Sequence, residues 1–171
     1  MIEIREEQPA DAPAVREVNE LAFGQPAEAD IVEAIRANCP EALSLVAVEE
    51  GAVVGHILFS LATIETDRGP VEGMGLAPMA VRPERQRQGI GSSLVRQGLE
   101  RMRERSCPFV IVLGHPEFYP RFGFERACKY NLRSQWAGVP DEAFLILFFD
   151  ESLKPHADGI ARYRSEFDQA M

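Results

Sequence analysis

A short basic segment with two glycines is the part of the chain best suited to hold an anion. Residues 86–92 read Gln-Arg-Gln-Gly-Ile-Gly-Ser and follow an apolar run over residues 73–81. After them, apolar residues recur with a helical period, at Ile90, Leu94, Val95, Leu99 and Met102. A loop that opens a helix leaves main-chain amides without partners at the positive end of the helix dipole, where anions bind. Gly89 and Gly91 let the backbone approach such a ligand closely. The segment therefore predicts a phosphate-binding cradle.

Two common phosphate-binding loops are excluded by the residues around Gly91. A nucleoside-triphosphate loop requires Gly-Lys-Ser/Thr, whereas Ser92 and Ser93 follow Gly91 directly. A dinucleotide fingerprint requires a third small residue where Leu94 stands. The alternative to a cradle is an ordinary strand-to-helix turn that happens to be basic.

The segment resembles the acyl-CoA loop of the GNAT superfamily of N-acetyltransferases, whose pattern is Gln/Arg-x-x-Gly-x-Gly/Ala. Its setting is also similar, because the family places that loop between a strand that reads like residues 79–83 and a long amphipathic helix. The resemblance implies a GNAT-like domain that uses acetyl-CoA as co-substrate. The residues that it assigns to acetyl-CoA are Met79, Ala80, Val81, Gln86, Arg87, Gln88, Gly89, Ile90, Gly91, Ser92, Tyr119 and Phe122.

Tyr119 carries the second part of the resemblance. It stands four residues before Gly123-Phe124, and the spacing Tyr-x-x-x-Gly-Phe is similar to that of many GNAT acetyltransferases. In that family the tyrosine hydroxyl lies near the CoA sulfur and can protonate the departing thiolate, and a tyrosine is in its donor form at neutral pH. The alternative is an aromatic residue of the core or of a pocket wall. Phe122 is expected to pack against pantetheine.

The similarity extends over residues 2–167 and is strongest to a bacterial subgroup of uncharacterised predicted N-acetyltransferases. The chain departs from the commoner family pattern after the fifth strand, where Gly114-His115-Pro116-Glu117 replaces an Asn-bearing helix. We therefore carry over no role from that Asn.

A base or a water chain is needed because most amines are protonated at neutral pH and must lose a proton before they attack a thioester. The side chains that could accept this proton are His115, Glu72, Glu28, Asp30 and Glu117. His115 is preferred, since histidine changes charge closest to neutral pH and this one follows the apolar run over residues 109–113. His56 lies within an apolar run and is expected to be a hydrogen-bonded structural residue. No cysteine motif suggests a covalent acyl-enzyme, so we expect direct attack.

Apolar runs and alternating segments predict the strands that carry these residues. Strands are expected over residues 2–6, 43–49, 53–64, 73–81, 109–113 and 144–149, with 124–130 as a candidate partner of the last. Glu50-Gly51 suits a tight hairpin. Pro78 inside a strand indicates a bulge, which in the family turns a backbone N–H toward the thioester carbonyl; an irregular loop over residues 73–78 is the alternative.

Helical periodicity predicts two helices before the basic loop. Asp11 is expected to cap the first, whose inward residues would be Val15, Val18, Leu21 and Ala22. The second is expected over residues 28–38, with Ile31 and Ile35 inward. Mixed strands with helices between them indicate an α/β or α+β domain with one central, mixed and strongly twisted sheet flanked by helices.

Composition limits the class of protein. The chain of 171 residues is the size of one domain, so residues 1–171 are expected to form a single acyl-CoA N-acyltransferase domain. Residues 151–171 would be its C-terminal extension, which adds a strand, covers the acceptor mouth or contributes to a dimer. The net charge of −9 disfavours nucleic-acid and anionic-membrane partners. Between residues 82 and 105, however, seven arginines face three glutamates, which suits an anionic cofactor.

The cysteines and the N-terminus indicate where the protein works. Cys39, Cys107 and Cys128 have no paired spacing, so we expect neither disulfides nor a metal site, and each cysteine is expected to be a small buried residue. No signal segment and no long apolar run is apparent, which predicts a cytoplasmic protein.

The sequence thus predicts an N-acetyltransferase that moves acetyl from acetyl-CoA to a primary amine, as a monomer or a homodimer. The acceptor is not specified, since variable loops build that side of the site. The competing hypotheses are a catalytically silent CoA-binding regulatory domain and a purely structural α/β domain.

Overall fold

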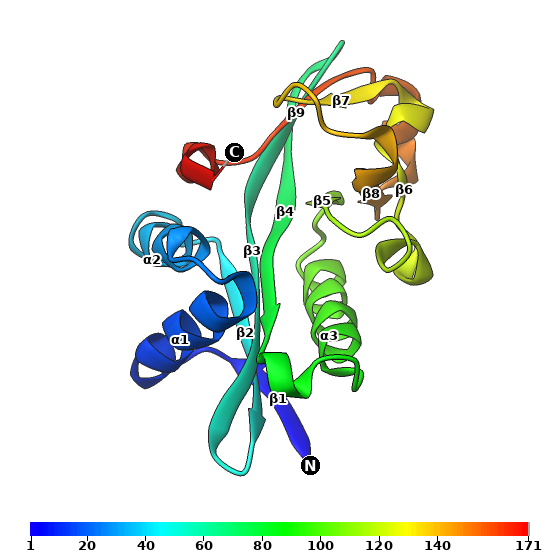
Figure 1. Ribbon diagram of the computed structural model, residues 1–171. Helices are drawn as coiled ribbons and strands as arrows, with labels where there is room; N and C mark the ends of the chain where they lie inside the picture. Colours follow the sequence, from blue (N-terminus) through cyan, green and yellow to red (C-terminus); the bar gives the residue numbers. More distant parts are fainter. Residues whose placement is uncertain (171) are drawn as a thin grey trace.

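The computed structural model describes residues 1–170, which form one mixed β-sheet with helices on both faces (Figure 1). The strands are β1 (Ile2–Glu6), β2 (Leu43–Glu49), β3 (Ala52–Thr66), β4 (Gly69–Val81), β5 (Phe109–Leu113), β6 (Glu125–Arg126), β7 (Leu132–Ser134), β8 (Phe144–Phe148) and β9 (Gly159–Arg162). They follow the order β1-β2-β3-β4-β5-β8-β6, and β9 pairs with β3 and β7. β4 and β5 run parallel, whereas the strands on either side of them pair antiparallel. The predicted fold class is confirmed.

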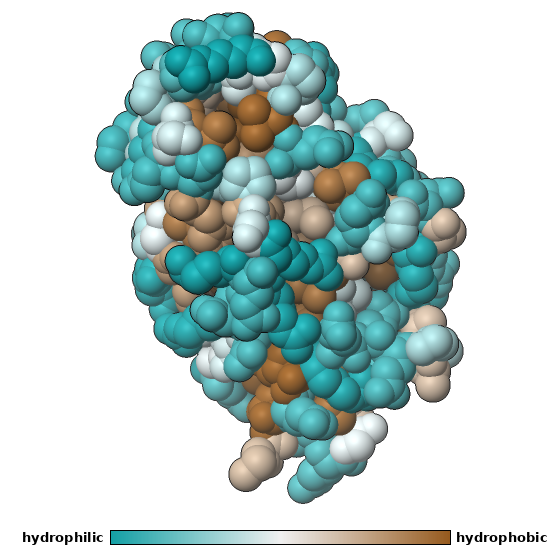
Figure 2. Space-filling view, turned by 180° about the vertical axis from the view of Figure 1, so that it is seen from behind, coloured by the Kyte–Doolittle hydropathy of each residue, from teal (hydrophilic) through white to brown (hydrophobic). Residues whose placement is uncertain are grey.

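Three α-helices cover the sheet. α1 (Ala12–Phe23) and α2 (Ala27–Asn38) lie on one face, and α3 (Ile90–Glu104) lies on the other (Figure 1). The apolar residues of each strand alternate between the two faces, so two clusters form, one under α1 and α2 and one under α3. The surface seen from behind is mostly hydrophilic, with hydrophobic residues gathered in small areas (Figure 2). No helix within residues 1–170 is long and apolar enough to cross a membrane.

Glycines allow the layers to approach closely at three places. A Cβ atom at Gly98 of α3 would lie 2.3 Å from the Phe59 ring of β3. A Cβ at Gly73 would lie 2.6 Å from the ring of Phe109, and one at Gly75 would lie 2.5 Å from the ring of Tyr163. These distances are shorter than any ordinary carbon contact, so α3 and the aromatic rings can sit on the sheet only because side chains are missing there.

A bulge in β4 and an opening beside it shape the centre of the sheet. Ile57 pairs with Met79 and Phe59 pairs with Leu76, so two residues of β4, Ala77 and Pro78, oppose one residue of β3. The bulge predicted from Pro78 is confirmed. β4 and β5 are paired only as far as Leu76 and Val112, after which β4 continues to Val81 paired with β3 alone. The two strands therefore separate at the bulge.

The C-terminal residues complete one side of this opening. Residues 159–162 add β9 to the sheet. This agrees with the expectation that residues 151–171 add a strand. The following 3-10 helix, η7 (Ser165–Ala170), packs against α2 (Figure 1). Phe167 is buried in the cluster under α1 and α2.

Two details of the first helix correct the sequence prediction. Leu21 was expected inward but is 45% exposed, and Asn19 is buried in its place. Asn19 can be buried because its amide nitrogen donates to the Val15 carbonyl oxygen at 2.9 Å and contacts Nδ1 of His56 at 3.1 Å. Asp11 does not cap α1 with its side chain. Its carboxylate instead accepts hydrogen bonds from Arg5, at 2.7 Å and 3.0 Å, and from the Gln8 amide.

The strand expected over residues 124–130 is also shorter than predicted. Only Glu125 and Arg126 pair with β8, and residues 127–130 form a 3-10 turn. The turn ends at Asn131, whose φ of 59° reverses the chain toward β7. The other predicted strands and α2 agree with the structure to within a few residues at their ends, β4 excepted, which begins at Gly69.

Candidate active site

The loop between β4 and α3 presents a row of free main-chain amides. Pro83–Arg85 form a 3-10 turn, and Arg87 and Gly89 then take left-handed φ angles of 63° and 86° as the chain enters the helix. Within residues 1–170, no carbonyl or side-chain oxygen accepts a hydrogen bond from the amides of residues 87–92. The first intrahelical bond is donated by Ser93 to the Gly89 carbonyl oxygen at 3.0 Å. The start of α3 therefore offers several donors at the positive end of its dipole.

A pocket of about 670 Å³ lies in front of these amides and is called the cradle pocket below. Its lining residues are Met79, Val81, Arg85, Gln86, Arg87, Gly89, Ile90, Gly91, Ser92, His115, Phe118 and Arg121. Three of them are arginines. The Arg85 guanidinium pairs with Glu49, yet its Nε atom is buried and meets no acceptor among the described residues. Free amides, arginines and a donor without a partner suit an anion.

A second pocket, called the inner pocket, adjoins the first at the place where β4 and β5 separate. It has a volume of about 280 Å³ and is lined by the β4 bulge, by β5 and the residues after it, by α1 and α2, and by η7. Met79 and His115 line both pockets. A ligand held by the amides of residues 87–92 could therefore extend to the bulge and meet a second ligand in the inner pocket.

The chain's family follows from comparison with known proteins. A model of the acetyltransferase (GNAT) domain matches residues 3–127, a segment that includes the bulge, the loop, α3 and Tyr119. The chain belongs to the GNAT acetyltransferase family. The resemblance drawn from the loop residues is thus confirmed.

Two curated GNAT relatives come from Escherichia coli K12. The uncharacterised N-acetyltransferase YhbS is 33% identical over 167 residues, which cover 97% of this chain and 98% of YhbS. The uncharacterised N-acetyltransferase YjhQ is 46% identical over 118 residues, which cover 68% of this chain and 65% of YjhQ, slightly less than two thirds of that protein. These relatives confirm the predicted similarity to bacterial N-acetyltransferases that are themselves uncharacterised.

Two solved GNAT structures share the whole fold. The crystal structure of E. coli YhbS in complex with CoA matches with a TM-score of 0.89 and 32% identity, covering 98% of this chain and 92% of that chain. A GNAT acetyltransferase from Brucella melitensis in complex with acetyl-CoA matches with a TM-score of 0.80 and 35% identity, covering 98% and 99%. Both of those proteins bind the cofactor that the loop pattern predicts.

Eight of the twelve residues assigned to acetyl-CoA in this GNAT chain line the cradle pocket, and Tyr119 lines only the inner pocket. The other three line neither pocket. Ala80 is buried in the cluster under α1 and α2, on the opposite face of β4. The Gln88 side chain is exposed beside the loop. Phe122 packs edge-on against Phe118, with ring centroids 5.1 Å apart, and Phe118 is the residue that lines the pocket. The sequence offered a signal for Phe118, an aromatic residue directly before Tyr119.

Tyr119 lines the inner pocket and is only 5% exposed. Its ring lies edge-on to Phe118 and Phe124, at centroid distances of 5.0 Å and 5.7 Å, and against Gly114, where a Cβ atom would lie 2.5 Å from the ring. Burial raises the pKa of Tyr119 to about 12, because the phenolate is poorly solvated there. Its hydroxyl makes no hydrogen bond within residues 1–170. The packing thus fixes the ring and leaves a protonated hydroxyl without a protein partner.

Among the proposed bases, His115 and Glu28 lie at the pockets. His115 is exposed and lines both, and its carbonyl oxygen accepts the Phe118 amide at 3.1 Å, which orders the turn that leads to Tyr119. Glu28 lines the inner pocket from α2. Asp30 pairs with Arg16 at 3.0 Å outside the pockets, and Glu72 and Glu117 are exposed and line neither pocket.

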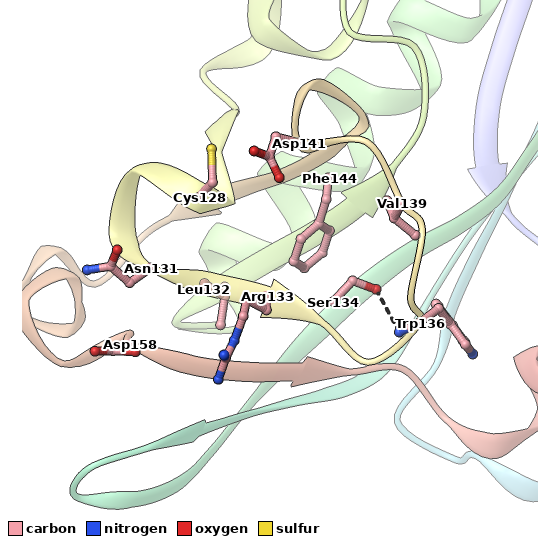
Figure 3. Close-up of a pocket in the computed structure, with 10 residues that line it drawn as sticks. All are labelled: Cys128, Asn131, Leu132, Arg133, Ser134, Trp136, Val139, Asp141, Phe144 and Asp158. Carbon is pink, nitrogen blue, oxygen red and sulfur yellow. Dashed lines mark hydrogen bonds between the residues drawn. The ribbon is translucent and has the colours of Figure 1, made fainter.

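A third pocket lies apart from the cradle, among β7, the loop that follows it and β8 (Figure 3). It has a volume of about 510 Å³ and contains none of the predicted site residues. Its wall is ordered by the Ser134 hydroxyl, which accepts the Trp136 amide at 3.1 Å. Cys128 lies here and is exposed, so the prediction that all three cysteines are buried is wrong for Cys128, which follows short strand β6 in a surface turn.

Proposed function

We propose that this chain transfers acetyl from acetyl-CoA to a primary amine by direct attack. The observation that carries the proposal is the row of free amides at residues 87–92, which faces a pocket that joins a second one at Met79 and His115. The GNAT relatives with CoA or acetyl-CoA bound support the same ligand. The amides would hold the pyrophosphate, and Phe118 would contact the pantetheine arm in the place expected for Phe122.

The protein groups fit that ligand. Gly89 has a left-handed φ, and no atom lies within 4 Å of the place that a Cβ would take there, so the amides around it are approachable. Arg87 and Arg121 line the cradle pocket and make no salt bridge within residues 1–170, and Arg85 has its free Nε. Charged donors of this kind form strong hydrogen bonds with phosphate oxygens. We propose this set, together with the predicted residues that line the cradle pocket, as the cofactor site.

The chemistry assigns one role to each of two side chains. Acetyl-CoA supplies the acetyl group as a thioester. We propose that Tyr119 donates its hydroxyl proton to the sulfur as the carbon–sulfur bond breaks and the carbon–nitrogen bond forms. His115, at the junction of the pockets, takes the proton that the ammonium must lose before attack, directly or through water. The nitrogen releases its second proton to solvent as the amide forms, and solvent returns a proton to Tyr119. Orientation of the two substrates in adjoining pockets supplies a further part of the rate.

The test is an assay of acetyl transfer. The protein is incubated with acetyl-CoA and a panel of primary amines, free CoA thiol is followed with a thiol reagent, and the acetylated amine is identified by mass spectrometry. We expect thiol and acetylated amine to appear in equal amounts. CoA binding without transfer to any amine would contradict the proposal and would favour the catalytically silent CoA-binding domain.

A further inference from the structure

We propose that the acceptor is a compact, hydrophobic primary amine with a single positive charge, and that Glu28 binds its ammonium group. This inference rests on the proposed function, because it treats the inner pocket as the place of the amine. It names the substrate class that the described walls of that pocket select.

The charge of the inner pocket is the first argument. Glu28 is half-buried and is the only carboxylate that lines the pocket in the described part of the chain. Its only hydrogen-bond partner there is the neutral amide of Gln25, at 3.0 Å and 3.2 Å. Its neighbours on α2 differ, since Asp30 and Glu33 both pair with Arg16 at 3.0 Å. A carboxylate at the wall of an apolar pocket is stabilised by a cation, and an ammonium group supplies one.

The same wall argues against other acceptors. No Lys or Arg side chain from residues 1–170 lines the inner pocket, so a carboxylate or phosphate on the acceptor would be left without a charged partner. A diamine enters the pocket with both nitrogens protonated, and Glu28, the one acidic side chain of residues 1–170 that lines the pocket, would leave its second ammonium against apolar groups. The lining therefore favours a single positive charge.

The remaining walls are apolar and partly aromatic. Phe23 from the end of α1, Phe167 from η7, and Trp136 and Tyr163 lie around the pocket with Leu76 and Ile31. Phe23 is 40% exposed at the border of the pocket, so its ring is accessible to a ligand there. Aromatic walls of this kind pack well against a hydrophobic or aromatic body.

The size of the pocket sets an upper limit on that body. A cavity of about 150 Å³ lined by apolar side chains is known to accept benzene. The inner pocket has about 280 Å³, which is enough for a phenyl ring or a branched alkyl group with a short aminoalkyl arm. η7 forms one wall and is held to the loop after β7 by the bond from Trp136 Nε1 to Asp168 at 3.2 Å.

Five acceptors that differ in charge and polarity separate these classes. They are phenethylamine, isopentylamine, putrescine, phenylalanine and a short lysine-containing peptide. We expect the first two to have a kcat/KM at least about tenfold above the other three, because each of the others leaves a charged or polar group without a partner. A preference for putrescine, phenylalanine or the peptide would overturn the proposal.

The role of Glu28 is tested with Glu28→Gln and with Glu33→Gln as the matched control on the same helix. Glu28→Gln should weaken binding of phenethylamine to the CoA-loaded protein about tenfold or more by calorimetry, and should leave CoA binding unchanged. Glu33→Gln should leave both unchanged. Equal amine binding by Glu28→Gln and the native protein, or no saturable amine binding at all, would refute the inference. Specific amine binding without acetyl transfer would instead refute the proposed function and leave the assignment of the pocket intact.

Discussion

Lowering the pH should destabilise the protein through one buried histidine, His56. This side chain lies on β3 and is fully buried against α1. The Asn19 amide donates to Nδ1, so neutral His56 carries its proton on Nε2 and donates it to the Ser44 hydroxyl oxygen at 2.8 Å. Ser44 in turn donates to Glu7 at 2.5 Å. The expectation that His56 is a hydrogen-bonded structural residue is therefore confirmed.

The magnitude follows from the pKa of His56. Burial, with a smaller effect of the Arg36 charge, lowers it from 6.5 to about 3. The unfolded chain therefore takes up a proton below about pH 6.5, whereas the folded chain resists protonation until about pH 3. The stability that neutral His56 provides is complete above pH 6.5 and decreases as the pH falls. Between pH 8 and pH 5 the expected loss in the free energy of unfolding is about 2 kcal/mol.

The assay is urea denaturation at pH 8 and pH 5 of the native protein and of His56→Gln, which cannot titrate. Gln can keep one hydrogen bond to Asn19 or Ser44, and its absolute stability does not enter the comparison. Every other group is common to the two proteins, so its contribution cancels. We expect the loss of stability between the two pH values to be about 2 kcal/mol smaller in His56→Gln. Equal losses would refute the assignment of a buried, neutral His56.

Two further substitutions test the site and the core. Tyr119→Phe should lower kcat about 100-fold while the KM for acetyl-CoA stays within about twofold, because it removes only the proton donor; unchanged kcat in steady-state kinetics would eliminate that role. Gly98→Ala should lower the free energy of unfolding by about 1–2 kcal/mol, since its Cβ would lie 2.3 Å from Phe59 and overpacking outweighs the gain in helix propensity. Gln97→Ala, at an exposed position of α3, is its control. If both variants melt at the same temperature, the close approach of α3 to Phe59 does not contribute to stability.

The fold and the free amides of the basic loop were readable from the sequence because local chemistry determines them. The basic loop needs positive φ angles and free amides, and Gly89 together with the helical period after Ile90 specifies both. The bulge was readable from Pro78, which cannot take part in an ordinary strand ladder. These features depend on neighbouring residues, so no knowledge of the tertiary structure was needed.

The parts that were missed depend on contacts between distant residues. Asn19 replaces Leu21 on the inner face of α1 because His56, far away in sequence, gives it a buried partner. Glu28 was one of several acids in the sequence, and only the packing of α2 between α1 and η7 places it at the inner pocket. Phe167 could not be assigned because nothing local shows that η7 returns to α2.

Binding of CoA to a variant of the cradle tests the central claim most directly. Gly89→Glu places a negative charge and a side chain before the amides of residues 87–92. Gly69→Glu is its control, because Gly69 also has a left-handed φ, of 102°, has equally open surroundings, and lies at the opposite end of β4 from the basic loop. Calorimetric titration should show CoA binding by the native protein and Gly69→Glu, and none by Gly89→Glu with its fold intact by circular dichroism. Unchanged CoA affinity in Gly89→Glu would contradict the account.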